Sequence, residues 1–358
     1  MPELPEVETM CRCVAPAVGS RIVDLVRPKS RLQSILISPR IDHFRRRVVG
    51  KTIAGIRRIG KRVVLELADG DDAHPSLRPE CDGPFFGRPR RTPLPTNCPS
   101  LSAKGTERLA ADGTSAHKQF EQSGPPIKAG CPVMPDGDDA AQYEYIVLEP
   151  RMTGLVLLAN PPNTSHVRLV FQLDGLRAEQ ILFWDQRGLG VARLLTHREL
   201  WEHLGPDQIG PDALAITADI LRQRLGNSRR AIKVALLDQS AVAGIGNLYA
   251  AEIVHHAAID PATPCQRLRA ADWNRIHAAI QEILTLAIRH QGSTLGDGTY
   301  RIAKNTPGDF QIFHRVYGRE GDSCLRCGNA SIVRIVQAQR STFYCPACQR
   351  SCRNGRKR

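Results

Sequence analysis

The N-terminal residues carry a nucleophile and two carboxylates within six positions. Pro2 follows Met1, so removal of Met1 would leave a secondary amine at the end of the chain, close to Glu3 and Glu6. An α-amino group titrates near neutrality, and the unprotonated amine can attack an aldehyde-like carbon to form an iminium ion. Glu3 and Glu6 lie one helical turn apart, so a helix starting here would keep both acids near the amine. The alternative interpretation is an ordinary helix start, which favours proline and acids in its first turn.

Four cysteines near the C-terminus have the spacing of a metal site. Cys324 pairs in sequence with Cys327, and Cys345 with Cys348, with a segment of hairpin length between the pairs. Four thiolates in this order suit one tetrahedral Zn²⁺ with no open position for a substrate, so we expect one structural zinc ion. Two disulfides or four buried free thiols are the alternatives. No secretory signal is recognisable, which predicts a reducing compartment and disfavours disulfides.

The charge of the chain indicates a polyanionic partner. There are 49 basic and 36 acidic residues, which gives a formal net charge of +13. Nucleic acid is the first candidate for such a chain. No apolar stretch reaches the ~20 residues needed to span a bilayer, so we expect no membrane association and a cytoplasmic, DNA-associated protein. The basic residues occur in runs over both halves of the chain: Arg45 to Arg47, Arg57 to Arg62, Arg229 to Lys233 and the tail from Arg350.

The elements that must position these residues change in character near residue 195. The first part predicts a helix over 3–18 followed by short strands, in an antiparallel sandwich or barrel. These strands are expected at 21–27, 52–59, 62–67, 145–149, 155–159, 166–173 and 181–184. The later part has helical periodicity, with helices expected at 197–204, 218–225, 231–237, 247–256 and 271–289.

One long segment interrupts the first part. From Gly70 to about Gln142 the sequence is rich in Pro, Gly, Ser and charged residues, with few regular apolar positions. Such composition cannot bury enough apolar surface to offset ordering, so it predicts a disordered insertion at about 71–142. It lies between two expected strands and should leave the domain intact.

Five motifs together resemble the formamidopyrimidine-DNA glycosylase (8-oxoguanine DNA glycosylase) and endonuclease VIII family. They are Met1 to Thr9, Arg151 to Gly154, Gly244 to Ala250, Val316 to Gly321, and the zinc hairpin with Gln339 to Cys345. The pair Leu4-Pro5 favours the formamidopyrimidine branch, and the resemblance covers nearly everything outside the insertion. It implies an α+β, multi-domain fold. The expected parts are an N-terminal catalytic β-sandwich with an N-terminal helix (1–195), a helix-two-turn-helix DNA-binding domain (196–295), and a lesion-loop segment with a C-terminal zinc-finger β-hairpin (296–358).

The resemblance also implies an activity. Members of this family rotate a damaged nucleotide out of double-stranded DNA. Here Pro2 would attack C1′ and displace the base, Glu3 would be the general acid at the sugar ring, and Glu6 would order the site. β-Elimination and then δ-elimination would cut the strand, which makes the chain a bifunctional DNA glycosylase/AP lyase of base-excision repair. Oxidised purines, namely 8-oxoguanine and formamidopyrimidines, are the expected lesions, and a monomer is the expected state.

The family's DNA contacts can be carried over residue by residue. Lys61 and Arg340 match cations that hold phosphate at the lesion, where a guanidinium fork suits bidentate binding. Met152, Arg187 and Leu189 match the side chains that fill the void left by the flipped base. The matched backbone contacts are His166, Arg229, Lys233 and Asn247. Without the resemblance, Lys61 would be a strand-edge lysine, Asn247 a helix cap, His166 structural, Met152 core and Arg187 surface.

Two segments depart from the family pattern. Residues 185–190 read Asp-Gln-Arg-Gly-Leu-Gly, where Asp-Pro-Arg-Arg-Phe-Gly is common. Gly188 stands where the family has its second arginine, so the phosphate contact of that arginine is missing. Leu189 stands where the family has an aromatic wedge. We hypothesise weaker discrimination of the opposite base: equal excision opposite cytosine and adenine would support this, and a sharp cytosine preference would refute it. Residues 292–309, where the family has its lesion loop, depart most.

Two other functions remain open at this point. One is an oxidised-pyrimidine glycosylase/lyase of the endonuclease VIII type, which an excision panel on defined duplexes would distinguish. The other is a non-catalytic zinc-ribbon protein that binds damaged DNA. Such a binder would form salt-sensitive complexes without a covalent adduct on abasic-site DNA.

Overall fold

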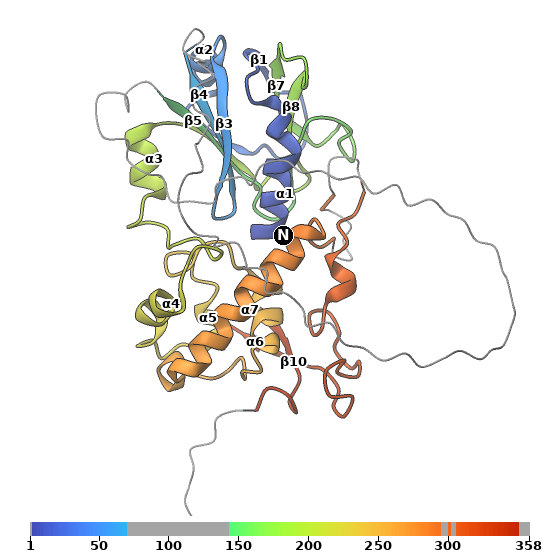
Figure 1. Ribbon diagram of the computed structural model, residues 1–358. Coiled ribbons are helices and arrows are strands. Elements are labelled where there is room, and N and C mark those ends of the chain that lie inside the picture. The colour runs from blue at the N-terminus through green and yellow to red at the C-terminus, as the bar shows by residue number, and fades with distance from the viewer. Residues whose placement is uncertain (1, 70–142, 295–299, 302–305, 351–358) are drawn as a thin grey trace, which may run out of the picture. The chain divides into compact units, whose positions relative to one another are not determined.

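The computed structural model describes residues 2–69, 143–294, 300–301 and 306–350 (Figure 1). The insertion expected at 71–142 lies outside the described residues, as do parts of the expected lesion-loop segment and the end of the basic tail. The boundaries expected at residues 195 and 295 stay predictions.

Two β-sheets form the N-terminal part. The first has the order β1-β7-β8-β6 and is antiparallel throughout; its strands are β1 (Ile22–Val26), β7 (Val167–Leu173), β8 (Gln180–Asp185) and β6 (Gly154–Leu157). The second has the order β2-β9-β5-β4-β3, with β2 (Leu36–Ser38), β9 (Val191–Thr196), β5 (Glu144–Glu149), β4 (Arg62–Ala68) and β3 (Thr52–Ile59). Buried residues of both sheets form one apolar cluster, including Leu65, Ile146, Phe171 and Phe183. The predicted sandwich is therefore present.

The antiparallel prediction is wrong for one pair of strands, because β2 runs parallel to β9. Both strands and the helix α2 (Ile41–Val48) were missing from the sequence prediction. Only three residues form β2, too few for a periodic signal, and α2 buries only Phe44 and Val48 along a strongly basic helix. The first helix is also shorter than predicted: α1 covers Leu4–Val14, and a 3₁₀ turn, η1 (Ala15–Ala17), follows it where Pro16 cannot continue the hydrogen-bond ladder.

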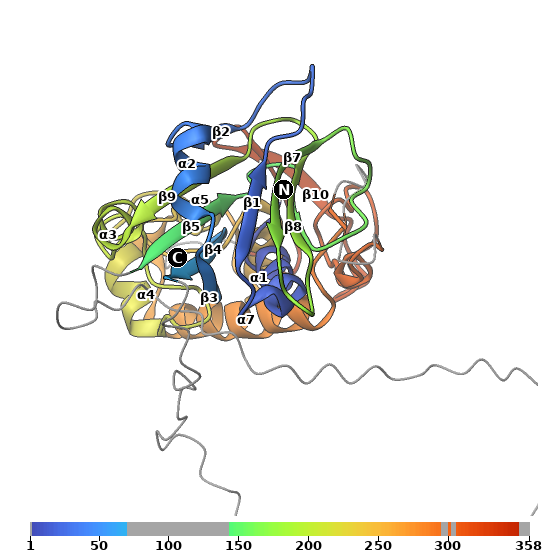
Figure 2. The same cartoon turned by 90° about the horizontal axis from the view of Figure 1, so that it is seen from above.

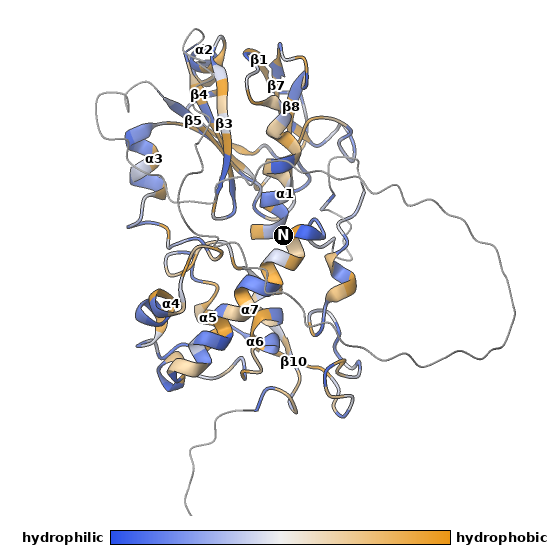
Figure 3. Cartoon of the chain, viewed as in Figure 1, coloured by the Kyte–Doolittle hydropathy of each residue, from blue (hydrophilic) through white to orange (hydrophobic). Residues whose placement is uncertain are grey.

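The helical part is built around one long helix. It contains α4 (Ala218–Leu225), α5 (Ile232–Ala235), α6 (Asn247–His256), the 3₁₀ turn η3 (Cys265–Arg267) and α7 (Ala270–Arg289), and α5 is shorter than the predicted 231–237. Trp273, Ile280 and Leu284 of α7 pack with buried residues of α4 and α6. Before them comes α3 (His197–Leu204), which is mostly hydrophilic in Figure 3 and whose Leu200 and Leu204 pack on strand residues of β5 and β9.

The C-terminal part is a short hairpin after a 3₁₀ turn, η4 (Phe310–Phe313). Strands β10 (Val333–Gln337) and β11 (Arg340–Tyr344) pair antiparallel, with Gln337 opposite Arg340. The two turn residues, Ala338 and Gln339, both have positive φ (45° and 60°), as a two-residue turn of the twist-compatible type requires. This turn makes Arg340 the first residue of β11.

Helix α1 connects the sandwich to the helical part (Figure 1). Leu4 belongs to the core of the helical part, whereas Val7, Met10 and Val14 belong to the core of the sandwich. The N-terminal residues, which carry the predicted nucleophile, therefore pack against both parts of the protein. A search of the described residues found no helix with the length and hydropathy needed to cross a bilayer.

Candidate active site

The Glu3 carboxylate lies at the N-terminus of α6. Its oxygens accept hydrogen bonds from the backbone N–H groups of Leu248 (3.0 Å) and Tyr249 (3.4 Å), although 245 residues separate Glu3 from Leu248. The first N–H groups of a helix have no partner within the helix and attract negative charge. Glu3 is 3% exposed, and Pro2 before it is also buried. The fold thus fixes one carboxylate next to the residue predicted to be the nucleophile.

Two glycines allow this approach. An added Cβ on Gly246 would lie 2.2 Å from Cδ of Glu3, and one on Gly244 would lie 2.5 Å from the Leu4 side chain. Gly244 also has φ +103°, and its carbonyl accepts the Leu4 N–H at 3.0 Å. The glycine motif of residues 244–246 is therefore needed for the chain start to reach α6.

The Glu6 carboxylate is buried and accepts three hydrogen bonds. Its donors are the Tyr249 hydroxyl (2.6 Å), the Ser293 N–H (2.8 Å) and the Glu3 N–H (2.9 Å). Burial, and then the charge of Glu3, raise the pKa of Glu6, while the hydrogen bonds lower it. Glu6 therefore connects the start of α1 to α6 and to the segment after α7.

Four predicted phosphate contacts gather beside Glu3. The Lys61 ammonium donates to the Ile245 carbonyl at 2.8 Å, and the Lys233 ammonium donates to the Asn247 side chain. Burial and the charge of Arg340 lower the pKa of both lysines, while the charge of Glu3 raises it; the net result for Lys233 is a pKa of about 8. Asn247 Nδ2 donates to the Ser341 carbonyl at 3.0 Å, next to Arg340 on the hairpin. Residues from four parts of the chain thus form one cationic cluster.

The structure corrects the interpretation of Asn247 and its helix. The N-cap of α6 is Gly246, not Asn247, and the first-turn N–H groups of Leu248 and Tyr249 bond Glu3. Those two donors are not free for phosphate. Any phosphate contact of Asn247 must use its side chain, which already bonds Lys233 and the hairpin.

The three predicted void-filling residues lie exposed on two connected loops. Met152 is 38% exposed and Leu189 is 45% exposed, and Arg187 is exposed beside it. The Thr153 hydroxyl donates to the buried Asp185 carboxylate at 2.5 Å and accepts the Arg187 N–H at 3.1 Å. This bonding holds the two loops together. A large exposed methionine there is not a core residue, so the core alternative for Met152 is wrong.

The other two predicted contacts lie outside the cationic cluster. His166 precedes β7; its Nδ1 lies 2.7 Å from the Asn163 side-chain oxygen, and its carbonyl accepts the Asp185 N–H at 2.9 Å. It therefore borders the loop of Arg187. Arg229 is exposed between α4 and α5.

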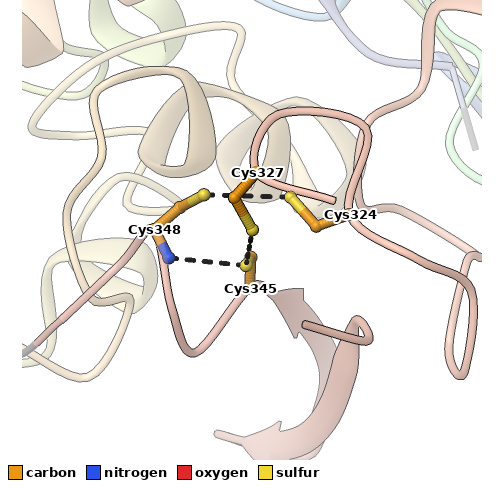
Figure 4. A group of neighbouring side chains, drawn as sticks. All are labelled: Cys324, Cys327, Cys345 and Cys348. Atoms are coloured by element: carbon orange, nitrogen blue, oxygen red, sulfur yellow. Dashed lines mark hydrogen bonds between the residues drawn. The ribbon is translucent and has the colours of Figure 1, made fainter. Parts of the chain in front are cut away.

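The four cysteines come together as predicted (Figure 4). Their sulfur atoms all lie within 4.8 Å of one another, with 3.8 Å between Cys324 and Cys348 and 3.7 Å between Cys327 and Cys345. Tetrahedral Zn²⁺ with Zn–S bonds of about 2.3 Å requires sulfur separations of about 3.8 Å, so the set fits one structural zinc ion. The alternative of two disulfides is wrong, because all four cysteines are free. His255 of α6 lies beside the site, with its Nε2 3.8 Å from the Cys324 sulfur.

Three residues of the site were not predicted from the sequence. Arg58 is fully buried and donates to Glu8 (3.1 Å), to Asp212 (2.5 Å) and to the carbonyl of Gly60 (3.0 Å), the residue before Lys61. The Tyr249 hydroxyl donates to Glu6, and Tyr249 lies within the motif Gly244 to Ala250. Glu252 accepts the N–H groups of residues 315–317, the start of another motif. No local pattern distinguishes Arg58 from the half-buried Arg57 beside it.

Three family models match this chain. The formamidopyrimidine-DNA glycosylase N-terminal domain matches residues 1–106, the H2TH domain of the same enzymes matches 204–298, and a zinc finger found in FPG and IleRS matches 321–350. The formamidopyrimidine-DNA glycosylase of Nitratidesulfovibrio vulgaris is 33% identical over 98% of this chain and all of its own length. That of Chloroflexus aurantiacus is 32% identical over 98% of both chains.

The chain belongs to the formamidopyrimidine-DNA glycosylase family. The crystal structure of the MutM (Fpg) protein from Thermus thermophilus agrees, with a TM-score of 0.67 and 26% identity over 98% of this chain and 99% of that one. The predicted fold class and the structural zinc ion are confirmed. This family member is a base-excision repair DNA glycosylase with AP lyase activity that acts on oxidised purines.

Proposed function

We propose that Pro2 is the nucleophile that this glycosylase/lyase uses on double-stranded DNA containing 8-oxoguanine or formamidopyrimidines. The observation that carries the proposal is the arrangement of Glu3 and Glu6 around the start of α1. Both are buried, and backbone N–H groups from α6 and from residue 293 fix their carboxylates. A nucleophile and its proton-transfer partner must be held in such a fixed relation.

The first step moves one proton from the amine to the sugar. The Pro2 nitrogen attacks C1′, and the base leaves with the electrons of the glycosidic bond. Glu3 takes the proton that the new C–N bond makes acidic and delivers it to the ring oxygen, acting there as the general acid. Ring opening then gives an iminium ion between Pro2 and C1′. Glu6 orders the site by fixing Glu3 and Tyr249.

The second step breaks the strand. The iminium ion acidifies the C2′ proton, and loss of that proton expels the 3′ phosphate; a second elimination expels the 5′ phosphate. Lys61, Lys233, Asn247 and Arg340 are the proposed phosphate contacts. Their clustering beside Glu3 supports this role, since each lysine lies within the electrostatic reach of Arg340. Excess positive charge stabilises the phosphate that leaves.

The remaining assignments complete the proposal. Met152, Arg187 and Leu189 fill the void left by the flipped nucleotide, and their exposure on connected loops supports that role. His166 and Arg229 contact the DNA backbone. We further propose a monomer in the cytoplasm, with domain boundaries near residues 195 and 295. In a crystal structure, the Lactococcus lactis Fpg, 25% identical to this chain, is non-covalently bound to DNA that contains an AP site. This supports such DNA as the partner.

The test is borohydride trapping on a duplex with 8-oxoguanine opposite cytosine and on one with an abasic site. The protein is compared in two forms: with Pro2 as the free N-terminus, and with an N-terminal extension that converts the Pro2 nitrogen into an amide. A C-terminal extension of equal length is the matched control. The free and C-terminally extended forms should give a trapped complex and a nicked strand, and peptide mapping should find the DNA on Pro2.

Each outcome decides one part of the proposal. Trapping by the N-terminally extended form, or a DNA adduct on a lysine, would refute Pro2 as the nucleophile. Reaction with the abasic site alone would keep the nucleophile and refute the lesion assignment. No adduct on either duplex would refute the proposed covalent chemistry.

A further inference from the structure

A basic loop connects β1 to β2. We use this name for residues 27–34, which contain Arg27, Lys29 and Arg31, all three exposed. The sequence has no Asp or Glu between Leu25 and Ile41. Within the described parts of the chain, no carboxylate forms an ion pair with any of the three cations. The loop therefore presents three positive charges that no carboxylate of the described residues neutralises.

The basic loop lies against the segment that carries Arg187 and Leu189. An added Cβ on Gly188 would lie 2.4 Å from the Gln33 carbonyl oxygen, and Gly188 has φ +68°. After the loop, the Leu36 N–H donates to the Gly190 carbonyl at 3.2 Å. Backbone atoms of residues 33 and 36 thus contact residues 188 and 190. The place that a side chain at 188 would need is filled by this loop.

A hollow separates the basic loop from β7. The cavity has a volume of about 320 Å³, and Arg27, Lys29 and Arg168 line it together with smaller residues. Arg168 donates to the carbonyls of Asp185 (2.8 Å) and Gln186 (3.3 Å), directly before Arg187. Its guanidinium is committed to positioning the void-filling segment, so the unpaired cations near this hollow are those of the loop.

We propose that the basic loop binds the DNA sugar–phosphate backbone next to the void-filling segment, in place of the arginine that residue 188 cannot carry. Figure 2 shows the loop projecting beyond β1 and β2, on the side of the sandwich away from α7. Phosphate is the anion that an exposed set of Lys and Arg without carboxylate partners recognises on DNA. The inference rests on the proposed function, because it assumes that DNA occupies this side.

The test measures how binding depends on salt. Each neutralised phosphate releases counterions and contributes about 0.9 to the slope of log K against log salt concentration. The double variant Lys29→Ala/Arg31→Ala should therefore lower the slope by about 1.8 on a duplex with a non-cleavable abasic analogue, and equally on undamaged duplex. Charge-conserving Lys29→Arg/Arg31→Lys should keep the wild-type slope. The matched control is Arg177→Ala/Arg198→Ala, the same charge change at two other exposed positions, which should also keep it.

The outcomes separate this inference from the proposed function. A slope equal to that of the wild type in Lys29→Ala/Arg31→Ala overturns the inference, as does an equal drop in the Arg177→Ala/Arg198→Ala control. Borohydride trapping at saturating DNA is measured on every variant. Trapping that persists in Lys29→Ala/Arg31→Ala while its slope falls supports the loop as a backbone contact. Wild-type protein that binds with the expected slope but traps nothing refutes the proposed chemistry and leaves the loop assignment standing.

Discussion

Replacing Tyr249 by Phe should shift the pH dependence of strand cleavage without removing the nucleophile. The Tyr249 hydroxyl donates at 2.6 Å to the buried Glu6 carboxylate and lowers its pKa, against burial and the charge of Glu3, which raise it. A hydrogen bond to a charged group contributes about 1.5–3 kcal/mol. Tyr249→Phe should therefore raise the pKa of Glu6 further, because the ionised carboxylate loses about that much stabilisation.

The sign of the effect follows from the protonation state that the site uses. Ionised Glu6 accepts three donors, so the acid limb of the rate of borohydride trapping should move to higher pH. At a fixed pH on that limb the rate should fall by about 10-fold or more, the equivalent of about 1.5 kcal/mol. For stability, a carboxyl with a raised folded pKa binds its proton more tightly when folded. The stability it contributes is present below the unfolded pKa and is lost as pH rises through the folded pKa. Tyr249→Phe should extend that loss to higher pH.

The assay is single-turnover trapping on abasic-site DNA across pH, combined with melting temperatures at each pH. Tyr300→Phe is the matched control, because its buried hydroxyl donates to the Gln291 carbonyl at 2.9 Å and not to Glu6. The control should keep the wild-type acid limb. An unchanged limb in Tyr249→Phe, or an equal shift in both variants, would refute the role given to Glu6.

Three further predictions follow from the site. Gly246→Ala should lower the rate of trapping by about 100-fold, since its Cβ would displace the Glu3 carboxylate from α6 and remove the proton transfer; a rate within a few-fold of wild type would contradict this. Lys233 should lose its charge as pH rises through about 8, so the affinity for DNA should fall there. The stability of the free protein should rise between about pH 8 and about pH 10.4, the ordinary pKa of lysine. Fluorescence titrations of DNA binding should find no fall in affinity near pH 8 in Lys233→Met. Cys324→Ser should lower zinc content, measured by metal analysis, and lower the melting temperature by more than the replacement of the non-ligand Cys13 by Ser.

The sequence predicted the residues of this site better than their contacts. The positions of Glu3, Lys61, Lys233 and Arg340 were predicted, because a motif preserves residue types and order. Their partners were not, since the contact of Glu3 with α6 spans 245 residues and no periodicity reports such a distance. Asn247 shows the consequence: without the resemblance, its position predicted a helix cap, but a carboxylate from the other end of the chain bonds the first-turn N–H groups.

The fold shows the same division. The longer elements β3 (eight residues) and α6 (ten residues) were predicted at their observed bounds, because a run of that length between turn residues is recognisable in the sequence. The parallel strand β2 was not, because three residues carry no period and the pairing with β9 is decided by tertiary contacts. Buried Arg58 belongs to this class as well. Its three partners lie in α1, in the turn before Lys61 and before α4, so its burial is a property of the assembled site.

Helix α6 connects the chemistry to the zinc ion. Its first turn holds Glu3, its middle residue Glu252 binds the N–H groups of 315–317, and His255 in its last turn lies 3.8 Å from the Cys324 sulfur. The hairpin on that zinc site carries Arg340, and its Ser341 carbonyl accepts from Asn247 at the start of the same helix. The zinc ion has no proposed step in the reaction, yet it would fix the hairpin that carries Arg340, the residue proposed to hold the phosphate. Loss of zinc should therefore weaken DNA binding before it affects the amine at Pro2, because the contacts of Glu3 and Glu6 with α6, Tyr249 and Ser293 do not involve the hairpin.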